Sequence, residues 1–248
     1  MNRILIYACI TSAILEPEAQ CAVVDLGTAR SFAVLGGSTV TNTGASFLQG
    51  SLGVNPGTAI TGFLGTVEND GPGTFSATSH QGDAIALQAR TDALASYNEL
   101  FGLTSTLDLT GLDLGGLTLT PGIYNFDSSA QLTGILTLDG AGNYVFQIGS
   151  TLTTASLATI SFTNGADPYN DVFWLVGTSA TLGVGTIFGG NILADQSNTL
   201  TSGASVVGRV IALNGAVTLD NNLIIPEPTT LSILGMCSLM LIRRKRKT

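Results

Sequence analysis

A short β-branched segment recurs in the second half of the chain with a period of 18 or 19 residues. Three stretches, 173–182, 192–200 and 210–219, each end in Thr-Leu. The threonines of these pairs are Thr181, Thr199 and Thr218. A period of this length is typical of one coil of a β-solenoid with three short faces.

The repeat extends towards the N-terminus. Thr151 opens another Thr-Leu pair, and its gap of 30 residues to Thr181 fits one coil plus an insertion, which we expect at 164–171. Thr118 and Thr137 are again 19 residues apart. Since one coil cannot bury its own apolar face, coils stacked about 4.8 Å apart share a core. The residues predicted to form an inward ladder in that core are Leu182, Leu200 and Leu219.

A β-sandwich built of hairpins is the alternative. Asn-Gly pairs, which are typical of hairpin turns, occur at Asn164 and Asn214. The residues around them lack regular hairpin alternation. The periodicity therefore favours a mostly β solenoid.

One segment, 81–101, breaks the β pattern. It has no proline and no glycine after Gly82, and it is rich in Ala, Leu, Gln and Glu. Asp83 suits a first turn and Gly102 suits a stop. We expect an amphipathic helix whose apolar face lies along the solenoid wall. The residues at helical spacing that define this face are Leu87, Leu94, Tyr97 and Phe101, with Ala84, Ala93 and Leu100 nearby.

The N-terminal residues 1–22 have the features of a secretory signal peptide. Arg3 precedes an apolar run over 4–15, which is too short for a comfortable membrane span. Residues 19–22 offer small side chains for cleavage. The alternative is a buried N-terminal strand. We predict an exported protein with its mature body at 23–225.

The C-terminus has three parts, a Pro-Glu-Pro triplet, an apolar run over 229–242 and a basic cluster over 243–247. Their order resembles the bacterial PEP-CTERM sorting signal, with Pro226, Glu227, Pro228, Arg243 and Arg244 as its defining residues. That resemblance implies cleavage by an exosortase-type protease, after which the protein is released or attached at the cell surface or in the extracellular matrix of a bacterium. Fourteen residues span only about 21 Å of helix, which suits a transient membrane anchor. A plain membrane anchor is the alternative.

Charge and composition exclude one function, nucleic-acid binding, and two fold classes, helical bundles and disordered chains. Residues 23–225 contain 14 acids and three arginines, giving a net charge near −11. Nucleic-acid binding is excluded, because a surface that follows phosphates needs Lys and Arg. High Gly and Thr content argues against a helical bundle. A hydrophobic content of 44% argues against disorder.

The body has almost no group of residues that is typical of a catalytic site. His80 is the one imidazole, and nothing in the sequence places it in a triad. The body lacks the Cys and His ligands of a zinc site, and no phosphate-binding glycine loop opens a helix. Scattered carboxylates leave a glycosidase and a calcium site open in principle. We predict that the protein is not an enzyme and needs no cofactor or metal.

The body from about residue 25 to 225 resembles the microbial ice-binding proteins with the discontinuous β-helix fold. The resemblance rests on the stretches 26–44, 50–63, 117–124, 145–155 and 214–222. It implies a right-handed β-helix of triangular section with one long helix alongside, in which an N-terminal segment supplies part of the ladder. It also implies binding to ice without covalent chemistry, by a protein that we expect to be a monomer.

Two faces are candidates for contact with ice. The first follows a Thr-Ala/Gly-x-Thr/Asn motif that the resemblance implies, intact only at 58–61 and degraded elsewhere. Its candidate residues are Thr58, Ala59, Thr61, Thr154, Ser202 and Ser205. The second follows the repeat, with Thr151, Thr181, Thr199 and Thr218. Because breaks shorten a matched patch, we expect weak to moderate activity.

Two other functions remain open. One is a structural or adhesive protein of the cell surface that keeps the fold without the ice face. The other is a polysaccharide-binding module. Thr is also simply a good strand residue, so spacing alone does not separate these possibilities.

Overall fold

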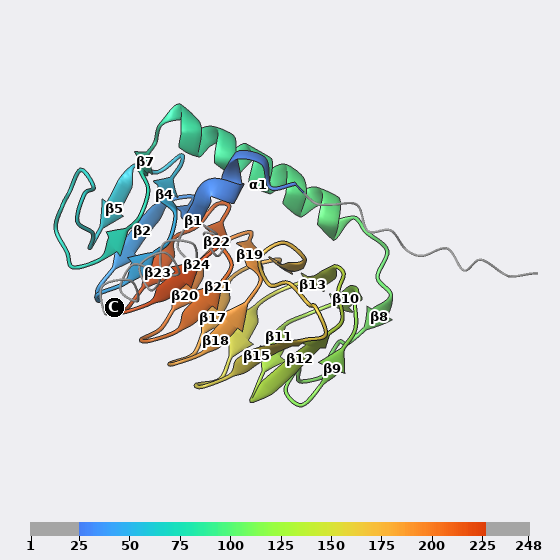
Figure 1. Cartoon of the computed structure of the whole chain (residues 1–248). Coiled ribbons are helices and arrows are strands. Elements are labelled where there is room, and N and C mark those ends of the chain that lie inside the picture. Colours follow the sequence, from blue (N-terminus) through green and yellow to red (C-terminus); the bar gives the residue numbers. More distant parts are fainter. Residues whose placement is uncertain (1–24, 227–248) are drawn as a thin grey trace, which may run out of the picture.

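The computed structural model of the chain describes residues 25–226 (Figure 1). Its strands form three parallel sheets, here called A, B and C. In spatial order, sheet A consists of β7 (Ser79–Gln81), β4 (Ser51–Val54), β1 (Phe32–Gly36), β22 (Val210–Ala212), β19 (Asn191–Ala194), β16 (Val172–Val176), β13 (Tyr144–Ile148), β10 (Gly122–Phe126) and β8 (Leu107–Asp108). Sheet B consists of β11 (Ala130–Leu132), β14 (Leu152–Thr154), β17 (Ala180–Leu182), β20 (Asn198–Leu200), β23 (Val217–Leu219), β2 (Thr39–Asn42) and β5 (Ala59–Thr61). Sheet C consists of β6 (Thr74–Phe75), β3 (Phe47–Leu48), β24 (Leu223–Ile225), β21 (Ser205–Val207), β18 (Ile187–Gly189), β15 (Thr159–Thr163), β12 (Ile135–Asp139) and β9 (Thr118–Leu119).

Successive coils pass from sheet A to B to C and return to A, as β19, β20, β21 and β22 do. This confirms the predicted solenoid and excludes hairpins, whose strands would pair antiparallel. The leucine ladder is confirmed, because Leu182, Leu200 and Leu219 pair in register and are buried. The insertion is confirmed as well, since 164–171 links β15 to β16. The right-handed winding stays a prediction.

The stack is discontinuous in sequence. Strand β1 lies between β22 and β4, so the N-terminal coils extend the stack beyond the C-terminal coil. Figure 1 shows this as red strands that lie beside blue ones. The chain then returns to the opposite end of sheet A, because β7 and β8 are its two edge strands.

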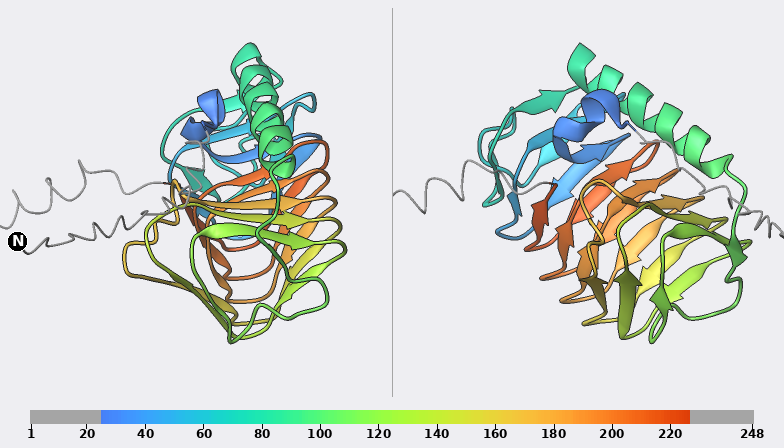
Figure 2. Two further views of the ribbon diagram at one scale, coloured as in Figure 1. Left: turned by 90° about the vertical axis from the view of Figure 1, so that its right-hand side faces the viewer. Right: turned by 45° about the vertical axis from the view of Figure 1, so that its right-hand side comes forward.

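Helix α1 (Ala84–Phe101) makes that return (Figure 2). Its 18 residues span about 27 Å, most of the length of the stack. Asp83 caps its N-terminus by accepting a hydrogen bond from the Ala86 N–H at 2.8 Å. The short 3₁₀ helix η1 (Gly27–Ser31) packs beside it.

The predicted inner face of this helix is confirmed only in part. Ala93 and Leu100 are buried, and Tyr97 packs against them and the core of sheet A. Leu87 is 51% exposed, and Leu94 and Phe101 also lie in solvent. The helix starts at Ala84 rather than at Gln81, which belongs to β7. Small residues form the buried face because α1 lies close against η1 and sheet A. These residues are Ala86, Ala89, Ala93, Ser96 and Leu100.

Stacked aromatic side chains fill part of the solenoid core. Tyr124, Phe146 and Trp174 occupy the same register on β10, β13 and β16. The rings of Phe146 and Trp174 lie 3.8 Å apart between centroids, at 4° to one another. Such layers help to hold neighbouring coils at one spacing.

The predicted signal peptide, 1–22, lies outside the described residues, as does the sorting segment after Pro226. Within residues 25–226, no helix is long and apolar enough to cross a membrane.

Candidate functional site

Six threonines form a straight file on the outer face of sheet B. Parallel pairing places each of them directly beside the next across six adjacent strands. We call this set the threonine file, and its members in spatial order are Thr153, Thr181, Thr199, Thr218, Thr41 and Thr61. Gln131 occupies the same register on the edge strand β11. The file is continuous across the junction between the C-terminal and N-terminal coils.

Strand alternation points the file outwards. In β20, Asn198 and Leu200 are buried on either side of Thr199. In β23 and β17 the flanking residues are buried in the same way. With strands about 4.8 Å apart, the file presents one methyl and one hydroxyl at each step. The β-branched side chain restricts χ1, so these groups are held in position.

A second column lies two residues before the file in each coil, at or just before the start of the strand. Its members are Ser129, Thr151, Ser179, Ser197, Ala216, Thr39 and Ala59. Several of its hydroxyls bond within the protein, as Ser197 Oγ accepts from the Ala216 N–H at 3.1 Å. Thr151 Oγ1 donates to Ser129 Oγ at 2.8 Å. These hydrogen bonds connect one coil to the next at the edge of sheet B.

The hydroxyls of the threonine file are different. None of them forms a hydrogen bond with another residue in the range 25–226. They are therefore directed at solvent water, while the second column holds the backbone in register.

The sequence candidates fall in several places. Thr61, Thr181, Thr199 and Thr218 belong to the file. Ala59 and Thr151 lie in the second column. Thr58 is exposed in the turn before β5. The hypothesis that Thr61 and Thr181 mark two different faces is wrong, because both lie in sheet B.

Three other candidates lie away from this face. Thr154 is buried at the corner between sheets B and C, where its Oγ1 lies 2.8 Å from Oγ1 of Thr186. Ser202 is in a turn, and Ser205 belongs to sheet C. The expected breaks in the motif therefore do not interrupt the file, and the reason for expecting weak activity no longer holds.

Sequence reasoning missed Thr41 and Thr153. It aligned Thr151 with the repeat because Thr151 also precedes a leucine, although Thr153 is the residue in register with Thr181. Each of the two missed threonines lies between two buried residues of its strand, but one of these is polar, Asn42 beside Thr41 and Thr154 beside Thr153, so the sequence alone does not identify that neighbour as inward.

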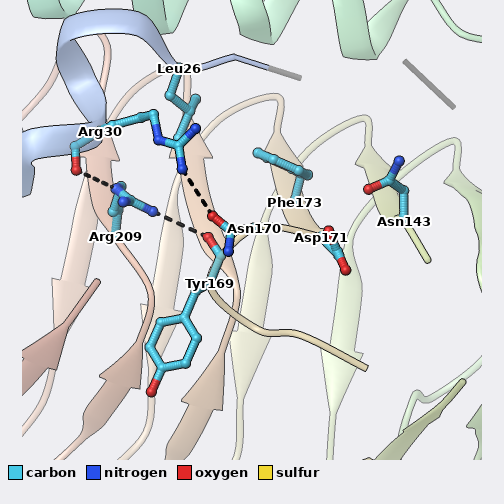
Figure 3. A pocket seen from close by; sticks show the side chains of 8 residues that line it. All are labelled: Leu26, Arg30, Asn143, Tyr169, Asn170, Asp171, Phe173 and Arg209. Atoms are coloured by element: carbon cyan, nitrogen blue, oxygen red, sulfur yellow. Dashed lines mark hydrogen bonds between the residues drawn. The ribbon is translucent and has the colours of Figure 1, made fainter. Parts of the chain in front are cut away.

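A small pocket of about 180 Å³ lies at the corner between sheets C and A (Figure 3). Arg209 is 1% exposed there and donates from Nε to the Arg30 carbonyl at 2.9 Å and from Nη1 to Asn191 Oδ1 at 2.9 Å. Burial, together with the nearby Asp167 carboxylate, raises the pKa of Asp171. Arg209 Nη1 also donates to the Tyr169 carbonyl at 3.2 Å, so Arg209 joins η1 to the insertion 164–171.

His80 is held by local contacts at the start of α1. Its Nδ1 lies 2.7 Å from Asp83 Oδ2, its Nε2 lies 2.8 Å from Thr78 Oγ1, and its ring packs on Phe32. Burial acts to raise the pKa of Asp83, but hydrogen bonds from the Ala86 N–H and His80 lower it overall. These contacts organise the helix cap. No group of three or more potential metal ligands occurs in residues 25–226.

Comparisons with known proteins agree with this geometry. A family model described as "Ice-binding-like" matches residues 34–225. An ice-binding protein of Nostoc sp. (strain HG1) is 49% identical over 98% of this chain and 95% of its own length. One from Flavobacterium frigoris (strain PS1) is 29% identical over 83% of this chain and 77% of its own length.

Solved structures show the same fold. The crystal structure of an ice-binding protein from the Antarctic ascomycete Antarctomyces psychrotrophicus superposes with a TM-score of 0.76 at 37% identity, covering 83% of this chain and 99% of that one. An ice-binding protein from an Arctic yeast, whose structure explains antifreeze activity, gives a TM-score of 0.73 at 29% identity, covering 83% of this chain and 95% of that one.

Proposed function

The chain belongs to the ice-binding-like family, and on this basis we propose that it binds ice through the threonine file of sheet B. The observation that carries the proposal is the unbroken register of six threonines whose hydroxyls have no partner among residues 25–226. Ice is a repeating array of water, so a repeating array of stiff side chains can meet it at many points at once.

The mechanism is adsorption. Each hydroxyl offers a donor and an acceptor, and each methyl lies beside it on the same rigid side chain. One contact of this kind is weak, because water competes for the hydroxyl. Six contacts held in register add together with little further loss of conformational entropy, since the backbone and the side chains are already ordered.

The two terminal segments determine where the protein acts. Residues 1–22 direct export. The segment from Pro226 is a sorting signal that anchors the protein transiently in a membrane until an exosortase-type protease cuts it. The protein then acts as a monomer at the cell surface or in the extracellular matrix of a bacterium. It uses no cofactor and catalyses no reaction.

The decisive experiment measures thermal hysteresis and inhibition of ice recrystallisation by the purified protein and two variants. Thr199→Tyr places a ring in the middle of the file and should remove most of the activity. Ser205→Tyr is the matched control, because Ser205 faces outwards from the next strand of the same coil, on sheet C. It should behave as the parent protein does.

Two results would contradict the proposal. Equal losses in both variants would show that the threonine file is not the contact surface. A parent protein without any effect on ice, together with retention on a glycan in a pulldown, would favour a polysaccharide-binding protein of the matrix.

A further inference from the structure

We propose that the threonine file faces away from the membrane to which the C-terminal segment anchors the protein, because the chain leaves the domain at the corner opposite sheet B. The inference rests on the proposed function, both for the ice-binding face and for the anchor. The partner surface that it assigns to the opposite corner is a lipid bilayer.

The path of the coils locates this exit. Each coil runs through sheets A, B and C in turn, so sheet B is bounded by its corners with A and with C. The last strand, β24, belongs to sheet C and ends at its far side. The Ile225 carbonyl accepts a hydrogen bond from the Gly208 N–H at 2.8 Å, and Gly208 lies in the turn from β21 to β22. The last strand of the domain therefore ends at the corner between sheets C and A, here called the C/A corner. This is the one corner that sheet B does not share.

The position of β24 along the stack also affects how the anchored protein is oriented. It is not an edge strand of sheet C, since β3 and β6 lie on one side of it and β21, β18, β15, β12 and β9 on the other. This follows from the discontinuous order, in which the N-terminal coils are added beyond the C-terminal coil. In a continuous solenoid the chain would leave from an end coil. Here it leaves from the flank, and a flank attachment allows the whole file to lie parallel to the membrane.

The linker is short enough to enforce this arrangement. Only residues 226–228 separate Ile225 from the apolar run that starts at Thr229. Three extended residues span at most about 10 Å. While the apolar run is in a bilayer, the C/A corner is held at the lipid headgroups, and sheet B is on the far side of the coil. Attachment of the cut chain through the same residues would give the same orientation.

The test uses the full chain with its C-terminal segment uncut, reconstituted in vesicles of phosphatidylcholine and phosphatidylglycerol. Single cysteines carry a fluorophore in a background where the native cysteines are serine. Asn170→Cys reports on the C/A corner, because Asn170 lies in the insertion between β15 and β16. Ser202→Cys and Gln196→Cys report on the two borders of sheet B, and all three positions are exposed.

A nitroxide on the lipid headgroups should quench the Asn170→Cys probe several-fold more strongly than either of the other two. Equal quenching, or stronger quenching beside sheet B, would overturn the proposal. Failure of the chain to float with the vesicles would also overturn it, because the anchor would then be absent.

Ice capture of the same vesicles separates this inference from the proposed function. Vesicles that carry the chain should be retained on ice. If the free protein binds ice and the vesicles do not, the orientation is wrong and the proposed function stands. If the free protein does not bind ice, the proposed function fails, and the quenching pattern still decides which corner faces the lipid.

Discussion

Sheets B and C are two sides of the same coils, and yet their outer surfaces have different chemistry. Each presents a column of outward residues in register, at the middle of the strands in sheet B and at the start of the strands in sheet C. In sheet C these residues are Thr74, Phe47, Leu223, Ser205, Ile187, Thr159 and Ile135. Large apolar side chains are mixed there with small polar ones, and Ile187 is 52% exposed. The solenoid thus supplies spacing to every face, but only the side chains of sheet B make a uniform surface.

The buried side chains of sheets B and C should contribute similarly to the free energy of unfolding. Leu200 on β20 and Phe188 on β18 are each 1% exposed in the common core. We expect Leu200→Ala to lower the free energy of unfolding by about 2–5 kcal/mol, and Phe188→Ala by about 3–5 kcal/mol. Thr199→Ala, one residue from Leu200 but facing outwards, should change it by no more than about 0.5 kcal/mol. Urea denaturation measures all three, and a cost for Thr199→Ala equal to that for Leu200→Ala would contradict the assignment of inner and outer positions.

The second prediction concerns the unity of the face on sheet B. Thr61→Tyr and Thr181→Tyr, made separately, should both lower inhibition of ice recrystallisation, because both residues belong to one file. At Thr181 we expect a loss of at least about tenfold, which corresponds to about 1.4 kcal/mol of adsorption free energy. The loss at Thr61 should be smaller, since β5 is an edge strand and most of the file remains accessible. An effect of only one of the two variants would show that the file does not act as a unit.

The third prediction tests whether spacing and side chain together are sufficient. In the Thr199→Tyr background, sheet C can be given its own file by changing its outward residues to threonine. The substitutions are Phe47→Thr, Leu223→Thr, Ser205→Thr, Ile187→Thr and Ile135→Thr. We expect a partial recovery of ice-recrystallisation inhibition, below the parent level because the loop 164–171 follows β15 and makes this side less regular. A folded variant with no recovery would show that sheet B has a property beyond its threonine register.

The sequence predicts the fold well because the fold is repetitive. The Thr-Leu period identifies inward leucines at once, since inward positions are apolar in most coils. The helix is harder to predict. Its long apolar side chains suggest a buried face, but close packing on η1 and sheet A leaves Leu87 exposed and buries the small residues Ala86 and Ala89 beside the expected Ala93.

The site is predicted only in part for a related reason. Outward threonines carry no packing constraint, so nothing in the sequence separates Thr151 from Thr153 until β14 pairs with β17. The two candidate faces form one file because the N-terminal coils pack beside β23. This packing places Thr41 and Thr61 next to Thr218 in the file. That pairing joins residues far apart in the chain and has no local signal.

The smallest predicted effect concerns pH, and it again separates the face from the scaffold. The threonine file contains no titratable group, so ice binding by the folded protein should not change between neutral pH and about pH 5. The scaffold does respond to acid. Asp113, which bridges to Gln131 at the end of sheet B, accepts hydrogen bonds from the Gly115 N–H at 2.7 Å and the Thr133 N–H at 2.9 Å. Burial acts to raise the pKa of this carboxyl, but the bonds from Thr133 and Gly115 lower it overall.

A lowered pKa in the folded state means that the ionised form stabilises the fold. This contribution is complete above the pKa of the unfolded chain, about 3.9 for Asp, and is lost as the pH falls through the lower folded value. We therefore expect the melting temperature to decline below about pH 4, and Asp113→Asn to reduce the steepness of that decline. Thermal melts of both proteins across this range measure the difference, with Ser202→Asn as a control on the surface away from the acid. An unchanged slope in Asp113→Asn would show that this turn does not contribute to the acid sensitivity. A loss of ice binding above pH 5, with the protein still folded, would mean that a titratable group outside the threonine file takes part in the contact with ice.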